Sequence, residues 1–259
     1  MTNTNEQLIN VEAGQVYVKQ WRDNQTDKLP IVLFHDSLGS VAMWRDFPET
    51  LLKQTRHPVI AYDRLGFGQS SVRNEAIELS FIEDEAIAFS ELKQQLGITN
   101  YIAIGHSVGG AMAIHVAAKD PQCRAVITIA AQAFVEAKTL HGIEDAAEQF
   151  KSKQHFARLE KWHGERTQWV LDSWINSWLA PQFKKWSLIP ALSSVTCPVL
   201  AIHGKEDEYG SSEFALTIAT HCQGPSDVLI LNNCAHMPHR EQTDSCLSAI
   251  SKFFSGHRL

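Results

Sequence analysis

Short runs of consecutive hydrophobic residues alternate with longer amphipathic segments along most of the chain. The runs are rich in Val and Ile and lack the alternation of polar and apolar residues that marks a strand with one face in water. Such runs are typical of strands buried on both faces of a parallel sheet. An intervening segment, residues 80–97, places Ile82, Ala86 and Phe89 on one face, which predicts an amphipathic helix. The runs are PIVLFH from Pro30, PVIAYD from Pro58, YIAIGH from Tyr101, RAVITIA from Arg124, PVLAIHG from Pro198 and DVLILN from Asp227.

This order of elements predicts an α/β fold with a doubly wound, mostly parallel sheet. Before the first parallel strand, LINV and QVYVKQW predict an antiparallel hairpin at the edge of the sheet. The alternation stops in residues 134–190, a stretch of 57 residues without a clear strand pattern that holds five of the seven tryptophans. We therefore predict a core of residues 1–133 and 191–259, with residues 134–190 inserted as a helical lid.

One segment of the predicted lid carries four apolar residues at i, i+3, i+4 and i+7 spacing, namely Leu171, Trp174, Ile175 and Trp178. This stripe is typical of a helix packed on a core. Trp169 projects from the opposite side, which leaves room for a second apolar surface above a pocket. We expect Trp169, Trp174 and Trp178 to line such a pocket.

Composition and charge exclude several classes of protein. The net charge of −6 and the lack of any Lys/Arg cluster longer than two residues argue against a nucleic-acid surface. Neither a basic leader with an apolar run nor a stretch of about 18 apolar residues is present, so we expect a cytoplasmic protein that does not enter membranes. The five cysteines are scattered and include no CxxC pair, so we expect neither a disulfide framework nor a metal site.

The strongest chemical motif is Gly105-His106-Ser107-Val108-Gly109, which joins a buried strand to a helix of small residues. In a G-x-S-x-G turn the serine occupies strained backbone at the apex, and the glycines leave room for the neighbouring strand and helix. We predict Ser107 to be a nucleophile. A second glycine-rich stretch, DRLGFGQSS, lacks both the dinucleotide fingerprint and the P-loop ending, so no cofactor is expected.

A serine nucleophile needs an imidazole base and a carboxylate that orients it. On this topology the acid and then the histidine should follow late strands. The loop after PVLAIHG offers Glu206, Asp207 and Glu208, and spacing alone does not choose among them. After the last strand, His236 falls in the loop where catalytic groups gather, whereas His239 would sit in the first turn of a helix beginning near Pro238.

Taken together, the chain resembles the α/β-hydrolase superfamily, specifically its small lidded serine hydrolases. The resemblance rests on HDSLGS, YDRLGFGQS, GHSVGG, HGKEDEYG and CAHMPHRE, which follow one another in the family order. It implies that Ser107 is the nucleophile, Asp207 the acid and His236 the base. It also implies an oxyanion hole made by the backbone N–H groups of Ser37 and Val108.

The sequence departs from the family pattern at Asp36, which occupies a position that is usually glycine, and at Ala235. A carboxylate at Asp36 would oppose a developing oxyanion unless it turns away or is paired. Asp36, His35 and His106 are candidates for the substrate pocket, and the two histidines either line it or have a structural role.

From these motifs and this resemblance we predict a serine hydrolase that cleaves a carboxylic ester of a small, largely apolar substrate. A lactonase, for example one acting on acyl-homoserine lactones, and a non-catalytic ligand-binding protein on the same fold stay open as alternatives. The oligomeric state is not set by the sequence, and a homodimer stays open.

Overall fold

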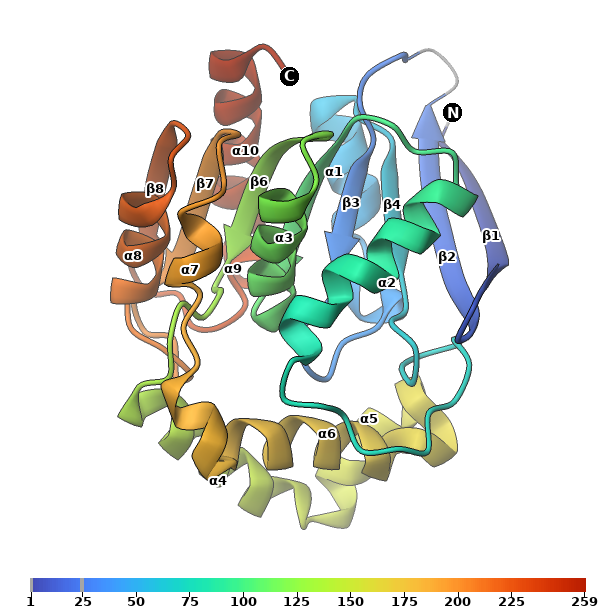
Figure 1. Ribbon diagram of the computed structural model, residues 1–259, viewed down its shortest axis with the longest axis vertical. Helices are drawn as coiled ribbons and strands as arrows, with labels where there is room; N and C mark the ends of the chain where they lie inside the picture. The colour runs from blue at the N-terminus through green and yellow to red at the C-terminus, as the bar shows by residue number, and fades with distance from the viewer. Residues whose placement is uncertain (1, 24–25) are drawn as a thin grey trace.

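The protein forms one eight-stranded sheet between layers of helices (Figure 1). The computed structural model describes residues 2–23 and 26–259. The strands lie in the order β1-β2-β4-β3-β5-β6-β7-β8, and all neighbours from β4 to β8 are parallel. The predicted doubly wound, mostly parallel sheet is therefore confirmed. The strands are β1 (Thr2–Val11), β2 (Gly14–Asp23), β3 (Ile31–Phe34), β4 (Val59–Tyr62), β5 (Tyr101–His106), β6 (Cys123–Ile129), β7 (Val199–Gly204) and β8 (Ser226–Leu231).

The hydrophobic runs form the central strands because both faces of the sheet are covered. Every residue of β3, β4, β5 and β7 is buried. At one edge, β1 and β2 form the predicted antiparallel hairpin, in which Val11 pairs with Gly14.

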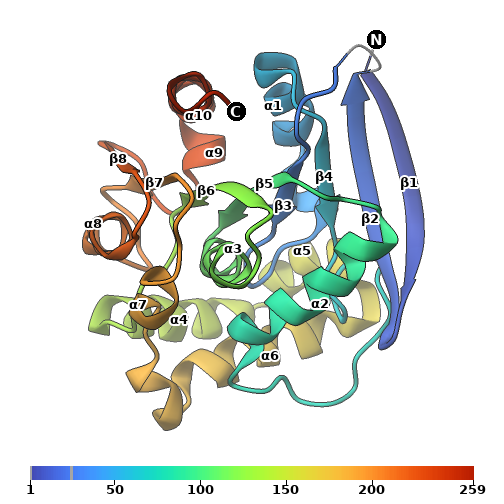
Figure 2. The ribbon, with the colours of Figure 1, turned by 45° about the horizontal axis from the view of Figure 1, so that its top comes forward.

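Helices cover both faces of the sheet and its carboxyl end. Figure 2 shows α1 and α10 on one face and α2, α3 and α8 on the other. The helices outside the inserted segment are α1 (Phe47–Thr55), α2 (Phe81–Gln95), α3 (Val108–Lys119), α8 (Glu213–His221), α9 (Pro238–Glu241) and α10 (Thr243–His257).

Between β6 and β7 the chain is helical and crosses the carboxyl ends of the parallel strands (Figure 1). An isolated bridge between Phe134 and Ser187 closes the base of this segment. The arrangement puts a helical cover over the loops that follow β3, β5, β6, β7 and β8. Its elements are α4 (Ala137–Phe150), α5 (Lys153–His163) and α6 (Thr167–Leu179), with 3-10 turns at Gly164–Arg166 and Pro181–Lys185. The short helix α7 (Ile189–Leu192) follows and lies beside α3 and α8 (Figure 1).

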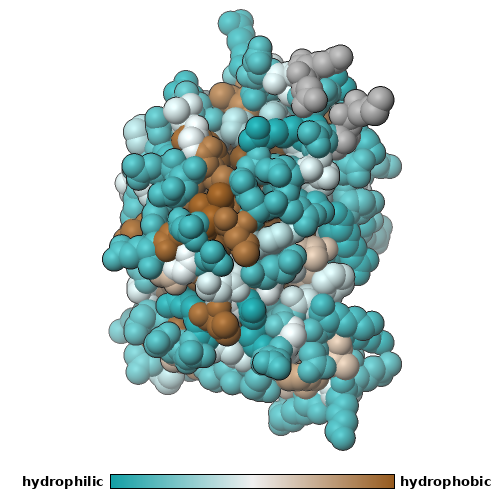
Figure 3. Space-filling view, turned by 90° about the vertical axis from the view of Figure 1, so that its right-hand side faces the viewer, coloured by the Kyte–Doolittle hydropathy of each residue, from teal (hydrophilic) through white to brown (hydrophobic). Residues whose placement is uncertain are grey.

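The face on the side of the β1–β2 hairpin is largely hydrophilic, with a hydrophobic patch near its middle (Figure 3). Large hydrophobic residues exposed on the elements of this side include Leu8 on β1 and Ile87 on α2. In the described part of the chain, no helix combines the length and the apolar character needed to cross a bilayer.

Candidate active site

Ser107 lies at the turn between β5 and α3, in a backbone conformation that few non-glycine residues adopt. Its φ is 54° and its ψ is −128°. The neighbouring glycines are required by close approach. A Cβ on Gly105 would lie 2.0 Å from the carbonyl oxygen of Gly109, and one on Gly109 would lie 2.1 Å from that of Phe34. The turn therefore holds the Ser107 side chain at the carboxyl end of the sheet, which is the geometry expected of a nucleophile elbow.

The loops after β7 and β8 bring Asp207 and His236 to this serine. The Ser107 hydroxyl oxygen lies 3.0 Å from His236 Nε2, and His236 Nδ1 lies 2.8 Å and 2.9 Å from the two carboxylate oxygens of Asp207. Because a carboxylate only accepts, the Nδ1–H donates to Asp207, and Nε2 is left to accept the serine proton. Asp207 also accepts a hydrogen bond from the backbone N–H of Tyr209 at 2.8 Å.

Burial and charge act in opposite directions on this pair. Burial lowers the pKa of His236, but the charge of Asp207 and its hydrogen bond, with smaller contributions from Glu208 and Asp36, leave that pKa above its ordinary value. Burial raises the pKa of Asp207, and the charge and hydrogen bond of His236 more than offset it, so this pKa lies below its ordinary value. The pair therefore favours an ionised carboxylate and an imidazole that readily takes up a proton.

Two backbone N–H groups beside the serine are free to bind an oxyanion. Val108 is the first residue of α3, so its N–H is one of the unpaired donors of a helix N-terminus. Within the described part of the chain, neither the Val108 nor the Ser37 N–H donates a hydrogen bond to another residue. The resemblance to the α/β-hydrolase superfamily implies the same two donors.

Asp36, whose charge would oppose an oxyanion, is paired. Its Oδ2 lies 3.3 Å from His106 Nδ1, and its Oδ1 accepts the N–H of Leu38 at 2.9 Å. Burial raises the pKa of Asp36, but the hydrogen bond and charge of His106 hold it well below its ordinary value. His106 Nε2 lies 2.8 Å from the carbonyl oxygen of His236. The ring of His106 thus faces acceptors at both nitrogens, and it links Asp36 to the loop that carries His236.

A cavity of about 240 Å³ opens beside Ser107, and we call it the Ser107 cavity. Among the residues already named, the cavity is lined by Asp36, Ser37, His106, Trp174 and Trp178. Six further residues, some apolar and some polar, also form its wall. These are Leu38, Met43, Gln132, Thr139, Ile143 and Met237.

His35 and Trp169 do not line this cavity. The His35 ring is buried and turned toward Arg64, whose backbone N–H donates to His35 Nε2 at 3.1 Å. Trp169 packs edge-on against Phe67 at 5.5 Å between ring centroids and donates its indole N–H to the carbonyl of Glu75 at 2.9 Å. Its side of α6 covers the loop after β4 rather than the cavity.

Several cavity residues escape the sequence analysis. The Gln132 side-chain nitrogen lies 3.3 Å from Ser107 Oγ, and Tyr209 packs against His236 with ring centroids 4.8 Å apart. Arg240 adds a positive charge to the wall, opposite to that of Glu208, which the sequence analysis names only as a candidate acid. Gln132 follows the carboxyl end of β6, next to β5, so the strand-end rule that singles out Ser107 and His236 applies to it as well.

His239 lies in α9 and is buried. Its ring packs between Trp44, Phe47 and His106, with centroid distances of 5.1, 5.4 and 4.6 Å. Burial, with the neighbouring charges of His106 and Arg240, holds its pKa well below the ordinary value. His239 is therefore a neutral packing residue beneath the loop of His236. Among the described residues, no three or more His, Cys, Asp or Glu side chains gather as they would around a metal ion.

The fold and the site together define a class of protein, the α/β hydrolases. A family model described as alpha/beta hydrolase fold matches residues 30–161, about half of the chain, and the chain belongs to this family.

Curated relatives match over a shorter stretch. The 1-acylglycerol-3-phosphate O-acyltransferase ABHD5 of Sus scrofa is 31% identical over 115 residues, which cover 42% of this chain and 31% of the relative. The (lyso)-N-acylphosphatidylethanolamine lipase of Mus musculus is 33% identical over 99 residues, which cover 38% and 28%. The chain thus spans less than a third of the length of these curated relatives.

Solved structures match over nearly the whole chain. The enol-lactonase from Burkholderia xenovorans LB400 superposes with a TM-score of 0.76 at 17% identity, covering 96% of this chain and 100% of that one. The carboxylesterase CesB (YbfK) from Bacillus subtilis superposes with a TM-score of 0.74 at 17% identity, covering 98% and 92%. At these identities the likeness shows the fold.

Proposed function

We propose that this protein is a serine hydrolase that cleaves small carboxylic esters through an acyl-enzyme intermediate. The observation that carries the proposal is the hydrogen-bonded series from Ser107 through His236 to Asp207, with contacts of 3.0 Å and 2.8 Å, beside two unpaired backbone N–H groups. Membership of the α/β hydrolase family and likeness to a carboxylesterase and an enol-lactonase support the same reaction class.

In the first half of the reaction, Ser107 Oγ attacks the ester carbonyl carbon while its proton passes to His236 Nε2. Asp207 stabilises the resulting imidazolium. The former carbonyl oxygen becomes an oxyanion that accepts hydrogen bonds from the N–H groups of Ser37 and Val108. Collapse of this intermediate expels the alcohol, which takes the proton from His236, and leaves an acyl ester on Ser107.

In the second half, water attacks the acyl carbon and gives its proton to His236. The tetrahedral intermediate then breaks the bond to Ser107 Oγ, which regains the proton, and the carboxylic acid leaves. Removing one oxyanion donor in sites of this kind costs on the order of 3 kcal/mol of transition-state stabilisation. Ser37 and Val108 are therefore as central to the proposal as the three side chains.

The size and lining of the Ser107 cavity favour short substrates. Its volume of about 240 Å³ is below the range of roughly 300–1,000 Å³ common for sites of drug-sized ligands. The apolar wall includes Leu38, Ile143, Trp174 and Trp178. We therefore propose an ester with a short or compact apolar acyl group as the small-molecule partner.

The first test asks whether Ser107 is an activated nucleophile. We expect a fluorophosphonate probe to label the wild-type protein at Ser107 and to leave Ser107→Ala unlabelled, as judged by mass spectrometry of the labelled peptide. Failure of the wild type to label would favour a ligand-binding protein on this fold and would overturn the proposal.

The second test sets the substrate class. We expect p-nitrophenyl acetate and butyrate to be hydrolysed with a higher kcat/KM than the dodecanoate, and hydrolysis to vanish in Ser107→Ala. Lactones of matched acyl size belong in the same panel, because the proposed chemistry cleaves cyclic esters as well. A preference for lactones over open-chain esters would assign the protein as a lactonase.

A further inference from the structure

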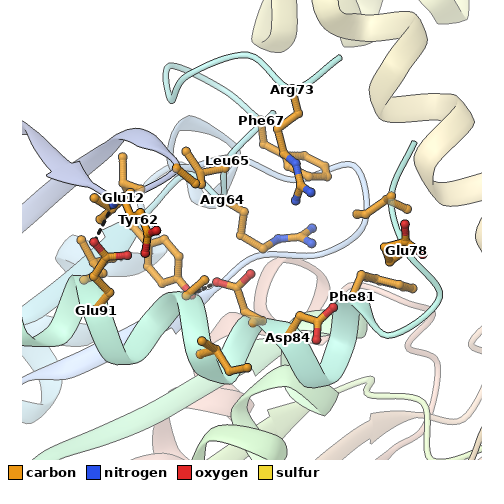
Figure 4. Close-up of a pocket in the computed structure, with 18 residues that line it drawn as sticks. Glu12, Tyr62, Arg64, Leu65, Phe67, Arg73, Glu78, Phe81, Asp84 and Glu91 are labelled. Carbon is orange, nitrogen blue, oxygen red and sulfur yellow. Dashed lines mark hydrogen bonds between the residues drawn. The ribbon is translucent and has the colours of Figure 1, made fainter. Parts of the chain in front are cut away.

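A second cavity, larger than the Ser107 cavity, lies between the β1–β2 hairpin, the loop after β4 and helix α2. Its volume is about 590 Å³, and it shares no lining residue with the Ser107 cavity. We call it the Arg64 cavity. None of the residues with a role in the proposed reaction lines it. Figure 4 shows the Arg64 and Arg73 side chains both extending toward its centre, Arg64 from the end of β4 and Arg73 from the loop that follows.

The two guanidinium groups retain donors without partners. Arg64 is buried, and its Nη2 donates to the carbonyl oxygen of Asp36 at 2.9 Å, while its Nε faces His35 Nε2 at 3.4 Å. Among the described residues, Arg64 Nη1 makes no hydrogen bond, and Arg73 makes neither a hydrogen bond nor an ion pair. Arg64 is a buried cation, and the nearby charges of Glu85 and Asp36 offset only part of the solvation that it gives up.

Five carboxylates line this cavity; three of them accept hydrogen bonds, whereas Glu12 and Glu78 are exposed to solvent. Glu85 accepts the Tyr62 hydroxyl at 2.5 Å, Asp84 accepts the Ser80 hydroxyl at 2.6 Å, and Glu91 accepts the backbone N–H of Glu12 at 2.6 Å. Burial raises the pKa of Glu85, and the charge of Arg64 and the hydrogen bond from Tyr62 act against that rise. Arg64 Nη1 and the Arg73 guanidinium group, which have no partner among the described residues, could therefore share one acceptor placed between them.

The rest of the wall is apolar. Leu65, Phe67, Ile77 and Phe81 line the cavity near the guanidinium groups, and Phe67 stacks beneath Arg64 with the guanidinium carbon 4.2 Å from the ring centroid. Burial lowers the pKa of Arg64. The charges of Glu85, Tyr62 and Asp36 act against this, and the like charge of Arg73 adds a smaller effect in the same direction as burial. An anion between the two groups would relieve this repulsion, and a hydrocarbon portion would cover the apolar wall.

We propose that the Arg64 cavity binds a small carboxylate with a hydrocarbon tail, the carboxylate between Arg64 and Arg73 and the tail against Phe67 and Phe81. The planar, forked guanidinium group pairs with a carboxylate through two parallel hydrogen bonds, which a single ammonium cannot do. Arg64 also holds the Asp36 carbonyl, so the occupant would contact the side chain that supports the Ser37 peptide.

The test uses octanoate as the probe and calorimetry as the measurement, with neutral 1-octanol as the ligand control. We expect saturable binding of octanoate to the wild type, and binding weaker by roughly tenfold or more in Arg73→Met, which keeps the length of the side chain and removes its charge. The variant should keep the melting temperature of the wild type, because Arg73 makes no hydrogen bond whose loss would destabilise the fold. 1-Octanol should bind more weakly than octanoate.

Two matched variants decide where octanoate binds. Arg158→Met removes an exposed arginine of α5 that lines neither cavity, and we expect it to bind octanoate like the wild type. Arg240→Met removes the guanidinium group of the Ser107 cavity, and binding should again persist. Lost binding in Arg240→Met with full binding in Arg73→Met would place octanoate in the Ser107 cavity and overturn the proposal. If octanoate shows no saturable binding to the wild type at concentrations up to about 10 mM, the proposal is overturned as well.

Discussion

At the scale of single residues, His236 and His239 lie three positions apart but have opposite surroundings. His236 contacts Ser107 and Asp207, whereas His239 is enclosed by Trp44, Phe47 and His106. We predict that His236→Ala lowers kcat by at least about 10³-fold without a large loss of stability, because it removes the base that accepts the serine proton.

His239→Ala is expected to act on stability. Deleting a buried ring leaves a void beneath the His236 loop, which should lower the free energy of unfolding by roughly 2–4 kcal/mol and reduce activity far less than His236→Ala does. Urea unfolding and ester hydrolysis at a temperature where both variants are folded measure the two effects. Abolished turnover in His239→Ala with turnover kept in His236→Ala would reverse the assignment.

The charges around His236 also set a pH dependence. The base must be neutral to accept a proton, so kcat/KM should fall as the pH drops through the pKa of His236, which lies above its ordinary value of 6.5. In Asp207→Asn the burial that lowers this pKa stays and the carboxylate that raises it is gone. We predict that the acid limb then moves to lower pH, while the maximal rate drops by roughly 10³-fold or more because the tautomer is no longer fixed. An acid limb unmoved by Asp207→Asn, read from the pH profile of kcat/KM, would contradict this account.

At the scale of elements, the loop after β3 depends on a side chain from the end of β4. The carbonyl oxygen of Asp36 belongs to the same peptide unit as the Ser37 N–H, and it faces Arg64 Nη2 at 2.9 Å and His35 Nδ1 at 2.8 Å. Hydrogen bonds donated to a carbonyl oxygen fix the plane of its peptide unit and polarise the N–H group of that same unit. Arg64 is therefore a positioning residue for the proposed oxyanion hole.

We predict that Arg64→Met lowers kcat by roughly tenfold, a fraction of the cost of losing an oxyanion donor outright, and leaves KM for p-nitrophenyl acetate nearly unchanged. A trifluoromethyl ketone, which forms the oxyanion on the enzyme, should bind more weakly to this variant, and Arg64→Lys should recover part of the loss. A rise in KM at constant kcat would instead assign Arg64 to substrate binding.

The ends of strands are also where sequence reasoning succeeds at this scale. The turn at Ser107 and the loops of Asp207 and His236 follow from uninterrupted hydrophobic runs, because parallel strands bring their carboxyl ends to one edge of the sheet. The directions of His35 and Trp169 do not follow, since each is set by contacts far along the chain, with Arg64 and with Glu75. Helical periodicity shows on which face of α6 Trp169 lies, but it does not show which part of the protein that face packs against.

At the scale of the whole molecule, the helical segment between β6 and β7 shares its hydrophobic core with the sheet. Ile143 of α4, Trp178 of α6 and Phe183 belong to the same buried cluster as residues of β5 and α3. The sequence predicts the insertion and the apolar stripe that includes Trp178, but the continuity of the core depends on how the stripe docks, which spacing along one helix cannot specify.

Trp178→Ala tests this continuity. The ring is 1% exposed and packs edge-on against Phe183 and Trp186, with centroid distances of 5.2 and 5.8 Å. Its loss should lower the free energy of unfolding by about 3–5 kcal/mol. Trp162→Ala, at a ring that is 37% exposed, is the matched control and should change it by less than about 0.5 kcal/mol.

Because one hydrophobic cluster spans both parts, we expect wild type and Trp178→Ala each to unfold in one transition, with tryptophan fluorescence and far-UV circular dichroism giving the same midpoint. If the helical segment were a separate folding unit, Trp178→Ala would melt it alone, and the fluorescence midpoint would fall below that of circular dichroism. Two separated transitions would therefore contradict a shared core, and with it the expectation that the roof of the Ser107 cavity is as stable as the sheet beneath it.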